Sequence, residues 1–261
     1  MENASEPASI ASGPAPTRYG LSGGVSSPLT LGLMSCGGIG ALLFTAIYLL
    51  EGATRQGYDA LRQPISALSL GPGGWAQQVN FIVFGVLLAL SAVGWYRLLA
   101  PAPGALWFPL LQGVSGLCLI GAGLFSMDPF PGYPPGVAPS PATTHGTLHT
   151  IFAWALMLTL AQGCFTLAQY VRHASMPLWR GWVGYSLLTG VLILVFWGGF
   201  LRYATGPLAG LIERLSAGSH ALWLCALTAT LLVQHWRSSG SPTSANRSAG
   251  GLWDERRNAT E

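Results

Sequence analysis

The sequence contains no lysine, and charged residues of any kind make up only 8% of its 261 positions. Soluble domains carry roughly 25% charged residues, so this composition excludes an ordinary soluble globule. All 12 basic residues are arginine, a bias that favours a GC-rich bacterial genome. The formal charge is only +3 and is spread along the chain, whereas a nucleic-acid surface needs a clustered basic stripe. We therefore expect no nucleic-acid partner.

Cysteine is scarce and forms no metal-binding or disulfide pattern. Each of the four cysteines lies within an apolar run, and no two of them have the CxxC spacing: Cys36, Cys118, Cys164 and Cys225. Such thiols are typical small apolar core residues, so neither disulfides nor a cysteine-based zinc site are expected. The centres of the long apolar runs also lack the ionisable residues that a proton or ion pathway needs. This absence argues against a pump or an ion-coupled transporter.

Long apolar runs are what the chain does contain. A hydrocarbon core of about 30 Å requires about 20 residues of helix, and six segments meet this requirement. The sixth has the least clear start, because residues 208–215 carry Glu213 and Arg214 and could form an interfacial turn before the span. The predicted spans are residues 29–50, 76–99, 107–127, 146–170, 179–201 and 215–236. The predicted fold class is all-α: a polytopic membrane protein with a six-transmembrane-helix bundle.

The two ends of the chain differ from these spans. Residues 1–28 and 237–261 are rich in small and polar residues and lack apolar periodicity, so both are predicted to be disordered tails. An even number of spans puts the two tails on one side of the membrane. Arginine is more frequent on that side, most clearly at Arg172 and Arg180. The positive-inside rule then predicts cytoplasmic termini for a multi-pass protein of the cell membrane.

Unusual polar residues gather in the three connections on the opposite, extracytoplasmic side. In the first of these connections, Asp59 and Arg62 stand three residues apart, which is the spacing of a helical ion pair. Ser66 follows after Pro64, a residue that could end a short interfacial helix. The candidate polar site comprises Asp59, Arg62, Ser66, Asp128, His145, His149, Glu213 and Arg214.

The arginines of this side have two possible kinds of partner. Arg62, Arg202 or Arg214 could bind a lipid phosphate, for which a planar guanidinium is suited. Alternatively, Glu213 could pair across the connections with Arg55 or Arg62. The sequence does not choose among these partners.

Two histidines have the spacing of a metal-binding pair. His145 and His149 stand at positions i and i+4 at the start of the fourth span, which puts both rings on one helix face. Asp128 and His220 could lie at a similar depth, and the four residues would then form a zinc site with an open position for water. The alternative is a polar network in which the histidines bind Asp128, Ser126 or loop carbonyls. Such a network would satisfy the loop at the membrane surface.

An ordered set of motifs resembles one bacterial family. The motifs are YDALRQPISALS at 58–69, GAGLFSMDP at 121–129, GYPPG at 132–136, HGTLH at 145–149 and GLIER at 210–214. With them, the chain from Leu29 to Trp236 resembles the family catalogued as domain of unknown function 998. Where such families often have an acidic residue directly after the second histidine, this chain has Thr150. The resemblance implies six membrane helices and leaves the function open.

Two functional hypotheses follow. The first is a non-enzymatic membrane protein whose extracytoplasmic loops bind or organise a lipid headgroup or a partner, because no complete catalytic constellation is visible. The alternative is a metal-dependent intramembrane hydrolase acting on a lipid ester or amide. In that case His145, His149 and His220 would hold zinc, with Asp128 as ligand or base and Ser66 in support. Membrane lipids are the expected partners under both hypotheses, while enzymatic activity and oligomeric state stay open.

Overall fold

The computed structural model describes residues 27–99, 104–138, 141–173 and 179–239. The two predicted tails lie outside these ranges except for residues 27–28 and 237–239. Within the described part the chain forms six long helices and no strand, and each helix is long and apolar enough to cross a membrane. The prediction of an all-α, six-span membrane protein is confirmed.

The six helices are joined in order by short or irregular connections. They are α1 (Pro28–Thr54), α2 (Gly74–Leu99), α3 (Trp107–Leu124), α4 (Thr144–His173), α5 (Arg180–Arg202) and α6 (Ala209–Ser239). A short 3₁₀ helix, η2 (Ile65–Ser69), lies between α1 and α2.

The start of the last helix differs from its prediction. The sixth span was expected to begin at residue 215, because charged side chains are costly inside a membrane, yet α6 begins at Ala209. Glu213 and Arg214 both bind backbone groups of the connection between α1 and α2, so the helix continues through them. At its other end α6 reaches Ser239, so residues 237–239 are helical rather than part of a disordered tail.

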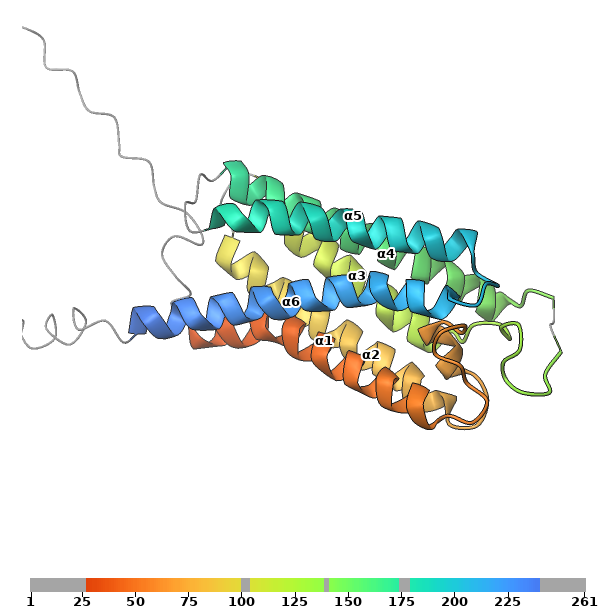
Figure 1. The fold of residues 1–261 in the computed structure, drawn as a ribbon. Coiled ribbons are helices and arrows are strands. Elements are labelled where there is room, and N and C mark those ends of the chain that lie inside the picture. Colours follow the sequence, from red (N-terminus) through yellow and green to blue (C-terminus); the bar gives the residue numbers. More distant parts are fainter. Residues whose placement is uncertain (1–26, 100–103, 139–140, 174–178, 240–261) are drawn as a thin grey trace, which may run out of the picture.

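The helices form a ring that closes between the first and the last. Each helix packs against the next one in the chain, and α6 packs against α1, as Figure 1 shows. The terminal end of the ring carries the start of α1 and the end of α6. The loop end carries the first connection (residues 55–73), the second connection (125–143) and the third connection (203–208). The predicted polar residues of these three connections therefore share one end of the bundle.

Glycine allows the closest helix contact. A Cβ atom on Gly85 of α2 would lie 2.5 Å from the carbonyl oxygen of Gly116 in α3, and a Cβ on Gly116 would lie 2.6 Å from that of Gly85. The two backbones therefore touch, as small residues permit in membrane bundles.

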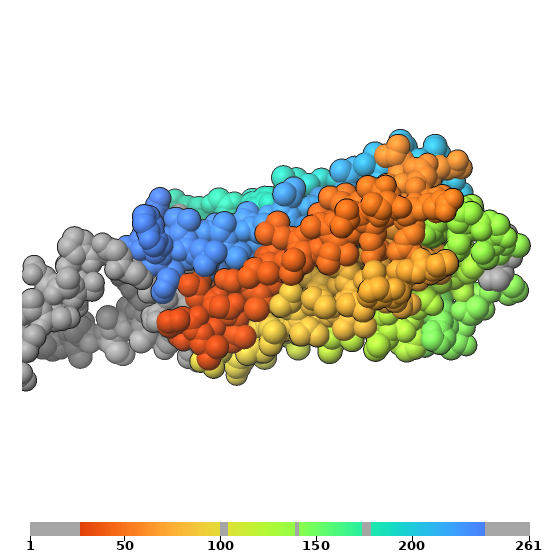
Figure 2. All heavy atoms as spheres, turned by 90° about the horizontal axis from the view of Figure 1, so that it is seen from below, coloured from red at the N-terminus to blue at the C-terminus, as the bar shows by residue number. Residues whose placement is uncertain are grey.

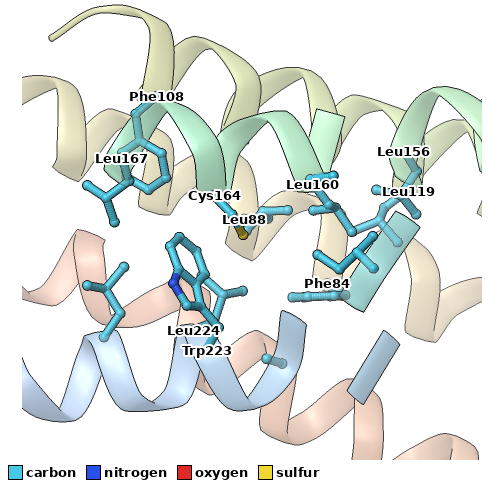
Figure 3. Close-up of a cluster of buried hydrophobic side chains, with 14 of the residues drawn as sticks. Phe84, Leu88, Phe108, Leu119, Leu156, Leu160, Cys164, Leu167, Trp223 and Leu224 are labelled. Atoms are coloured by element: carbon cyan, nitrogen blue, oxygen red, sulfur yellow. The ribbon is translucent and has the colours of Figure 1, made fainter. Parts of the chain in front are cut away.

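Large aromatic side chains fill the terminal half of the ring. The rings of Trp95 and Phe108 meet edge to face with centroids 5.0 Å apart, and Phe108 meets Trp223 at 6.0 Å. Figure 3 shows Trp223 reaching from α6 toward Leu167 and Cys164 of α4. All five side chains are fully buried, so this half of the bundle is densely packed.

The outer surface is apolar along the helices. Leu42 of α1, Leu158 of α4 and Leu222 of α6 are each more than half exposed, at 62%, 58% and 69%. Figure 2 shows α1, α2 and α6 forming one continuous face. Exposed leucines on several helices are expected where the surrounding solvent is lipid.

Candidate functional site

The first connection is docked on the start of α6 by Arg214. Nη1 of Arg214 donates hydrogen bonds to the carbonyls of Ala60 at 2.7 Å and Gln63 at 2.9 Å, and Nη2 donates to the hydroxyl of Tyr58. Both terminal nitrogens are thus bound within the protein. Arg214 is therefore not placed to bind a lipid phosphate, the role that the sequence suggested for it.

Tyr58 links the first connection to the second. Its hydroxyl donates to the carbonyl oxygen of Pro64 at 2.9 Å, and the carbonyl oxygen of Gln63 lies 3.1 Å from the same hydroxyl. Its ring meets the ring of Tyr133 edge to face with centroids 5.4 Å apart. Burial raises the pKa of the Tyr58 hydroxyl, while Arg214 acts in the opposite direction. Tyr58 was not among the predicted site residues, because no sequence pattern relates it to a partner 156 positions away.

Glu213 holds the other end of the same connection. Its Oε2 atom accepts the backbone N–H of Ile65 at 2.6 Å, the first residue of η2. A helix start has unpaired N–H groups, and a carboxylate is a strong acceptor for one of them. Glu213 is only 7% exposed and forms no ion pair with any described residue. The expected pairing of Glu213 with Arg55 or Arg62 is wrong.

Arg55 and Asp59 of the first connection have local partners. Arg55 pairs with Glu51, one turn earlier in α1, at 3.2 Å, and also donates to the carbonyl of Pro72 at 2.9 Å. Asp59 does not pair with Arg62 as predicted; its Oδ1 accepts the N–H of Leu61 at 2.9 Å, because a short acidic side chain readily closes a local turn.

Two exposed arginines stay as predicted candidates for lipid contact. Arg62 has an exposed side chain. Arg202 is also exposed, and its guanidinium carbon lies 5.4 Å from the ring centroid of Tyr203. Contact of either arginine with a lipid phosphate remains a prediction.

Asp128 caps the start of α4. Its Oδ1 accepts from the hydroxyl of Thr143 at 2.6 Å, and its Oδ2 accepts the N–H of the same residue at 3.1 Å. The Thr143 hydroxyl in turn accepts the N–H of Gly146 at 3.0 Å. A Cβ on Gly146 would lie 2.0 Å from Oδ2 of Asp128, so glycine is required for this approach. The carboxylate is therefore held at the positive end of a helix dipole.

His149 joins the start of α4 to the end of α3. Its Nδ1 lies 3.0 Å from the carbonyl oxygen of Ala122 and 2.8 Å from that of Phe125. Since carbonyls only accept, Nδ1 carries the proton, and Nε2 of the neutral ring keeps a lone pair. His145 is exposed, and its ring packs against Phe125 with centroids 5.5 Å apart. Binding to carbonyls was the expected alternative to a metal site.

The four residues predicted as zinc ligands do not come together. In the described part of the chain, no group of three or more His, Cys, Asp or Glu side chains is placed to hold a metal ion. Asp128 is bound to the start of α4 and His149 to the end of α3, while His145 is exposed at the surface. The geometry therefore gives no support to this zinc site or to a hydrolase built on it.

A cavity of about 370 Å³ occupies the loop half of the ring. All six helices and the start of η2 contribute to its wall, which is mainly apolar. Ligand pockets commonly measure about 300–1,000 Å³, so this one is large enough for a small molecule or part of a lipid. Its polar lining residues are Thr45, Tyr48, Ser66, Asp128, His149, Thr150, Glu213 and His220.

Two of these residues have unused polar atoms in the cavity wall. His220 is 3% exposed, and its Nε2 has no hydrogen-bond partner among the described residues. Nε2 of His149 likewise receives no hydrogen bond from the described chain. A buried polar atom without a partner is costly, so the wall is suited to polar atoms as well as to hydrocarbon.

The exposed lining residues of the cavity lie on α4 and α5. Most lining side chains are buried or half-buried, and the exposed ones are Thr150 and Trp154 of α4 and Leu201 of α5. Trp154 is 49% exposed and Leu201 is 39% exposed. Both helices are long enough to cross a membrane, so these residues lie on the side of the bundle. Sequence reasoning missed them, because they look like any others of an apolar span.

Comparison with known proteins identifies a family and no function. Residues 38–230 match a family model described as a protein of unknown function, DUF998. Comparison with curated proteins and with solved structures gives no match.

Proposed function

Because the chain belongs to the DUF998 family, whose description names no function, we propose a function from the geometry of the loop end: the protein binds one membrane lipid in its cavity. The observation that carries the proposal is a mainly apolar cavity of about 370 Å³ whose exposed lining residues lie on two membrane-spanning helices. A water-soluble ligand would gain little from such a wall, whereas a hydrocarbon chain is matched by it.

The position of the exposed lining residues supports entry from the bilayer. Thr150, Trp154 and Leu201 lie where α4 and α5 pass side by side. An amphiphile in the adjacent leaflet can insert its chain between these helices without crossing water. Trp154 has the amphipathic ring that favours a membrane interface, which supports entry at the depth of lipid headgroups and upper chains.

The connections support a binding role because they are held in place. Arg214 and Glu213 attach the first connection to α6, and Asp128 attaches the second connection to α4. A preformed site avoids part of the entropic cost of binding. Residues of all three connections, among them Ser66, Asp128 and Ala204, line the cavity, so the held connections keep this part of its wall in place.

The test is to fill the cavity and measure the lipid that stays with the protein. Ala217 lines the cavity on α6, whereas Leu222 on the same helix is 69% exposed. We expect wild-type protein and Leu222→Trp to retain about one lipid per chain after exchange into detergent, and Ala217→Trp to lose it. Mass spectrometry of intact complexes gives the count. Equal lipid content in all three proteins would show surface lipid alone and reject the proposal.

A second pair of variants guards against a folding defect in the first. Ala153 lines the cavity on α4, and Leu158 on that helix is 58% exposed. Ala153→Phe should also lose lipid, and Leu158→Phe should keep it. The proposal fails if Ala153→Phe is folded, as judged by its melting temperature, and still retains lipid at the wild-type level.

We assign the loop end to the extracytoplasmic side and the termini to the cytoplasm. Arg97, Arg172 and Arg180 border the terminal end, and such residues favour the cytoplasmic side. Fusion of a fluorescent protein to the C-terminus should give fluorescent cells, while fusion of periplasmic alkaline phosphatase should be inactive. The opposite pair of results would reverse the assignment.

A further inference from the structure

We infer that the lipid bound in this cavity carries an ammonium head group, so that the protein is a receptor site for a long-chain amine rather than for a phosphate or carboxylate lipid. The inference rests on the proposed function and adds the chemistry of the head. It follows from the acidic side chains and the unoccupied acceptor positions of the cavity wall.

The charged residues of the wall are acidic. Glu213 and Asp128 line the cavity, and no arginine belongs to its described lining. Arg214 follows Glu213 in α6, and its guanidinium carbon lies 5.8 Å from the ring centroid of the lining residue Tyr48. Both of its terminal nitrogens are bound to the first connection and to its own helix. A phosphate or carboxylate head would therefore approach two carboxylates while the neighbouring guanidinium is already engaged, which is electrostatically unfavourable.

Two residues of the wall have acceptor positions that no described donor occupies. Glu213 accepts one N–H, from Ile65, although an ionised carboxylate has about four acceptor positions. Nε2 of His149 holds a lone pair because Nδ1 is the donor. An ammonium group offers three donors and no acceptor, so it matches this wall better than a hydroxyl, which offers one donor.

The arrangement along α6 orients the ligand. Glu213 lies in the second turn of α6, near the loop end, and His220 lies seven residues further, about 10 Å deeper at 1.5 Å per residue. Ala217 and Ala221 face the cavity beside them and leave room. The head is bound at the level of Glu213, and the chain extends toward the middle of the bundle. His220, with its unpaired nitrogen, provides a second polar contact for a hydroxyl on the chain.

Three amphiphiles of equal chain length test the head group: dodecylamine, dodecanol and dodecanoate. Each is titrated into delipidated full-length protein in a neutral detergent at pH 7, where the amine is protonated. The melting temperature is followed with a thiol-reactive dye, because Cys118 and Cys164 are buried in the folded protein. A ligand that binds the folded state raises the melting temperature. We expect a rise with dodecylamine, a smaller rise with dodecanol and none with dodecanoate.

Matched charge variants identify the residue that binds the ammonium group. Glu213→Gln keeps an oxygen for the Ile65 N–H and should raise the apparent dissociation constant of dodecylamine about tenfold, while leaving that of dodecanol unchanged. Glu51→Gln removes a carboxylate that pairs with Arg55 outside the cavity lining, and should leave both unchanged. Loss of dodecylamine affinity in Glu51→Gln to the same degree would indicate a general charge effect and overturn the assignment.

The outcomes distinguish a failure of this inference from a failure of the proposed lipid binding. If all three amphiphiles bind equally and Ala217→Trp abolishes their binding, the cavity binds lipid but does not select the head, and the inference alone fails. Binding of dodecanoate as tight as that of dodecylamine would also reject it. If Ala217→Trp responds to dodecylamine as the wild-type protein does, binding occurs outside the cavity and both ideas fail.

Discussion

Glu213 and Arg214 are consecutive residues of α6, yet their side chains bind opposite kinds of backbone group in the same connection. Glu213 accepts the N–H of Ile65, and Arg214 donates to the carbonyls of Ala60 and Gln63. Each charge is thus matched by peptide groups of the first connection instead of by its neighbour. The start of α6 and this connection consequently form one structural unit at the edge of the cavity.

Replacement of Arg214 by alanine should release the first connection. Hydrogen bonds from a charged donor contribute about 1.5–3 kcal/mol each, and since the lost bonds share one side chain we expect the free energy of unfolding to fall by about 3 kcal/mol. Limited proteolysis should cut within residues 55–73. Arg202→Ala, which removes an exposed guanidinium that contacts Tyr203, is the control and should leave both the stability and the cleavage pattern unchanged.

Replacement of Gly210 by alanine should destabilise the folded protein, whereas the same replacement at Gly218 of the same helix should not. A Cβ on Gly210 would lie 2.3 Å from the carbonyl oxygen of Gln63 and 2.6 Å from that of Ala60, whereas a Cβ on Gly218 has nothing within 4 Å. Gly210→Ala should cost about 1–3 kcal/mol through overpacking, and Gly218→Ala should stabilise by up to about 1 kcal/mol. Thermal melts in one detergent compare them. Equal melting temperatures of the two variants would contradict the close contact between Gly210 and the first connection.

Asp128 and Thr143 should behave as a coupled cap. Each substitution, Asp128→Ala or Thr143→Val, should cost about 1–2 kcal/mol, the usual range for a lost helix cap. The double variant should cost less than the sum by at least about 0.5 kcal/mol, as contacting residues do in a double-mutant cycle. Strict additivity would show that the two side chains act independently.

Stability at alkaline pH should report on Tyr58. Burial raises the pKa of its hydroxyl in the folded protein, whereas an unfolded tyrosine titrates near pH 10. Above about pH 10 the unfolded state loses the hydroxyl proton while the folded state keeps it. The contribution of Tyr58 to the free energy of unfolding is therefore full below that pH and declines as pH rises. In the Tyr58→Phe variant, the free energy of unfolding should therefore decrease less steeply between about pH 10 and 12 than in the wild-type protein. An unchanged slope would contradict the role of burial.

The membrane spans were predictable because run length alone decides them. A helix such as α1 has apolar residues on all sides and no charge between residues 29 and 50, and only a membrane span accommodates that. The same uniformity hid the cavity. Trp197 in the wall and Leu158 on the outside belong to equally apolar helices, so the sequence does not distinguish the lumen from the lipid face.

The polar contacts were harder to predict because their partners are backbone atoms. Sequence reasoning looked for ion pairs and metal ligands among the side chains, and it therefore joined Asp59 to Arg62 and His145 to His149. The structure instead satisfies His149 with carbonyls from residues 24 and 27 positions away. Peptide groups occur at every position, so they leave no pattern that identifies the one that will be used.

Ring closure between α1 and α6 has a consequence for the order of assembly. The sixth helix supplies Glu213, Arg214 and His220, and it also packs against α1. A chain truncated before residue 209 would lack one wall of the cavity and both side chains that hold the first connection to α6. We therefore expect the cavity to form only when the sixth helix has joined the other five in the membrane.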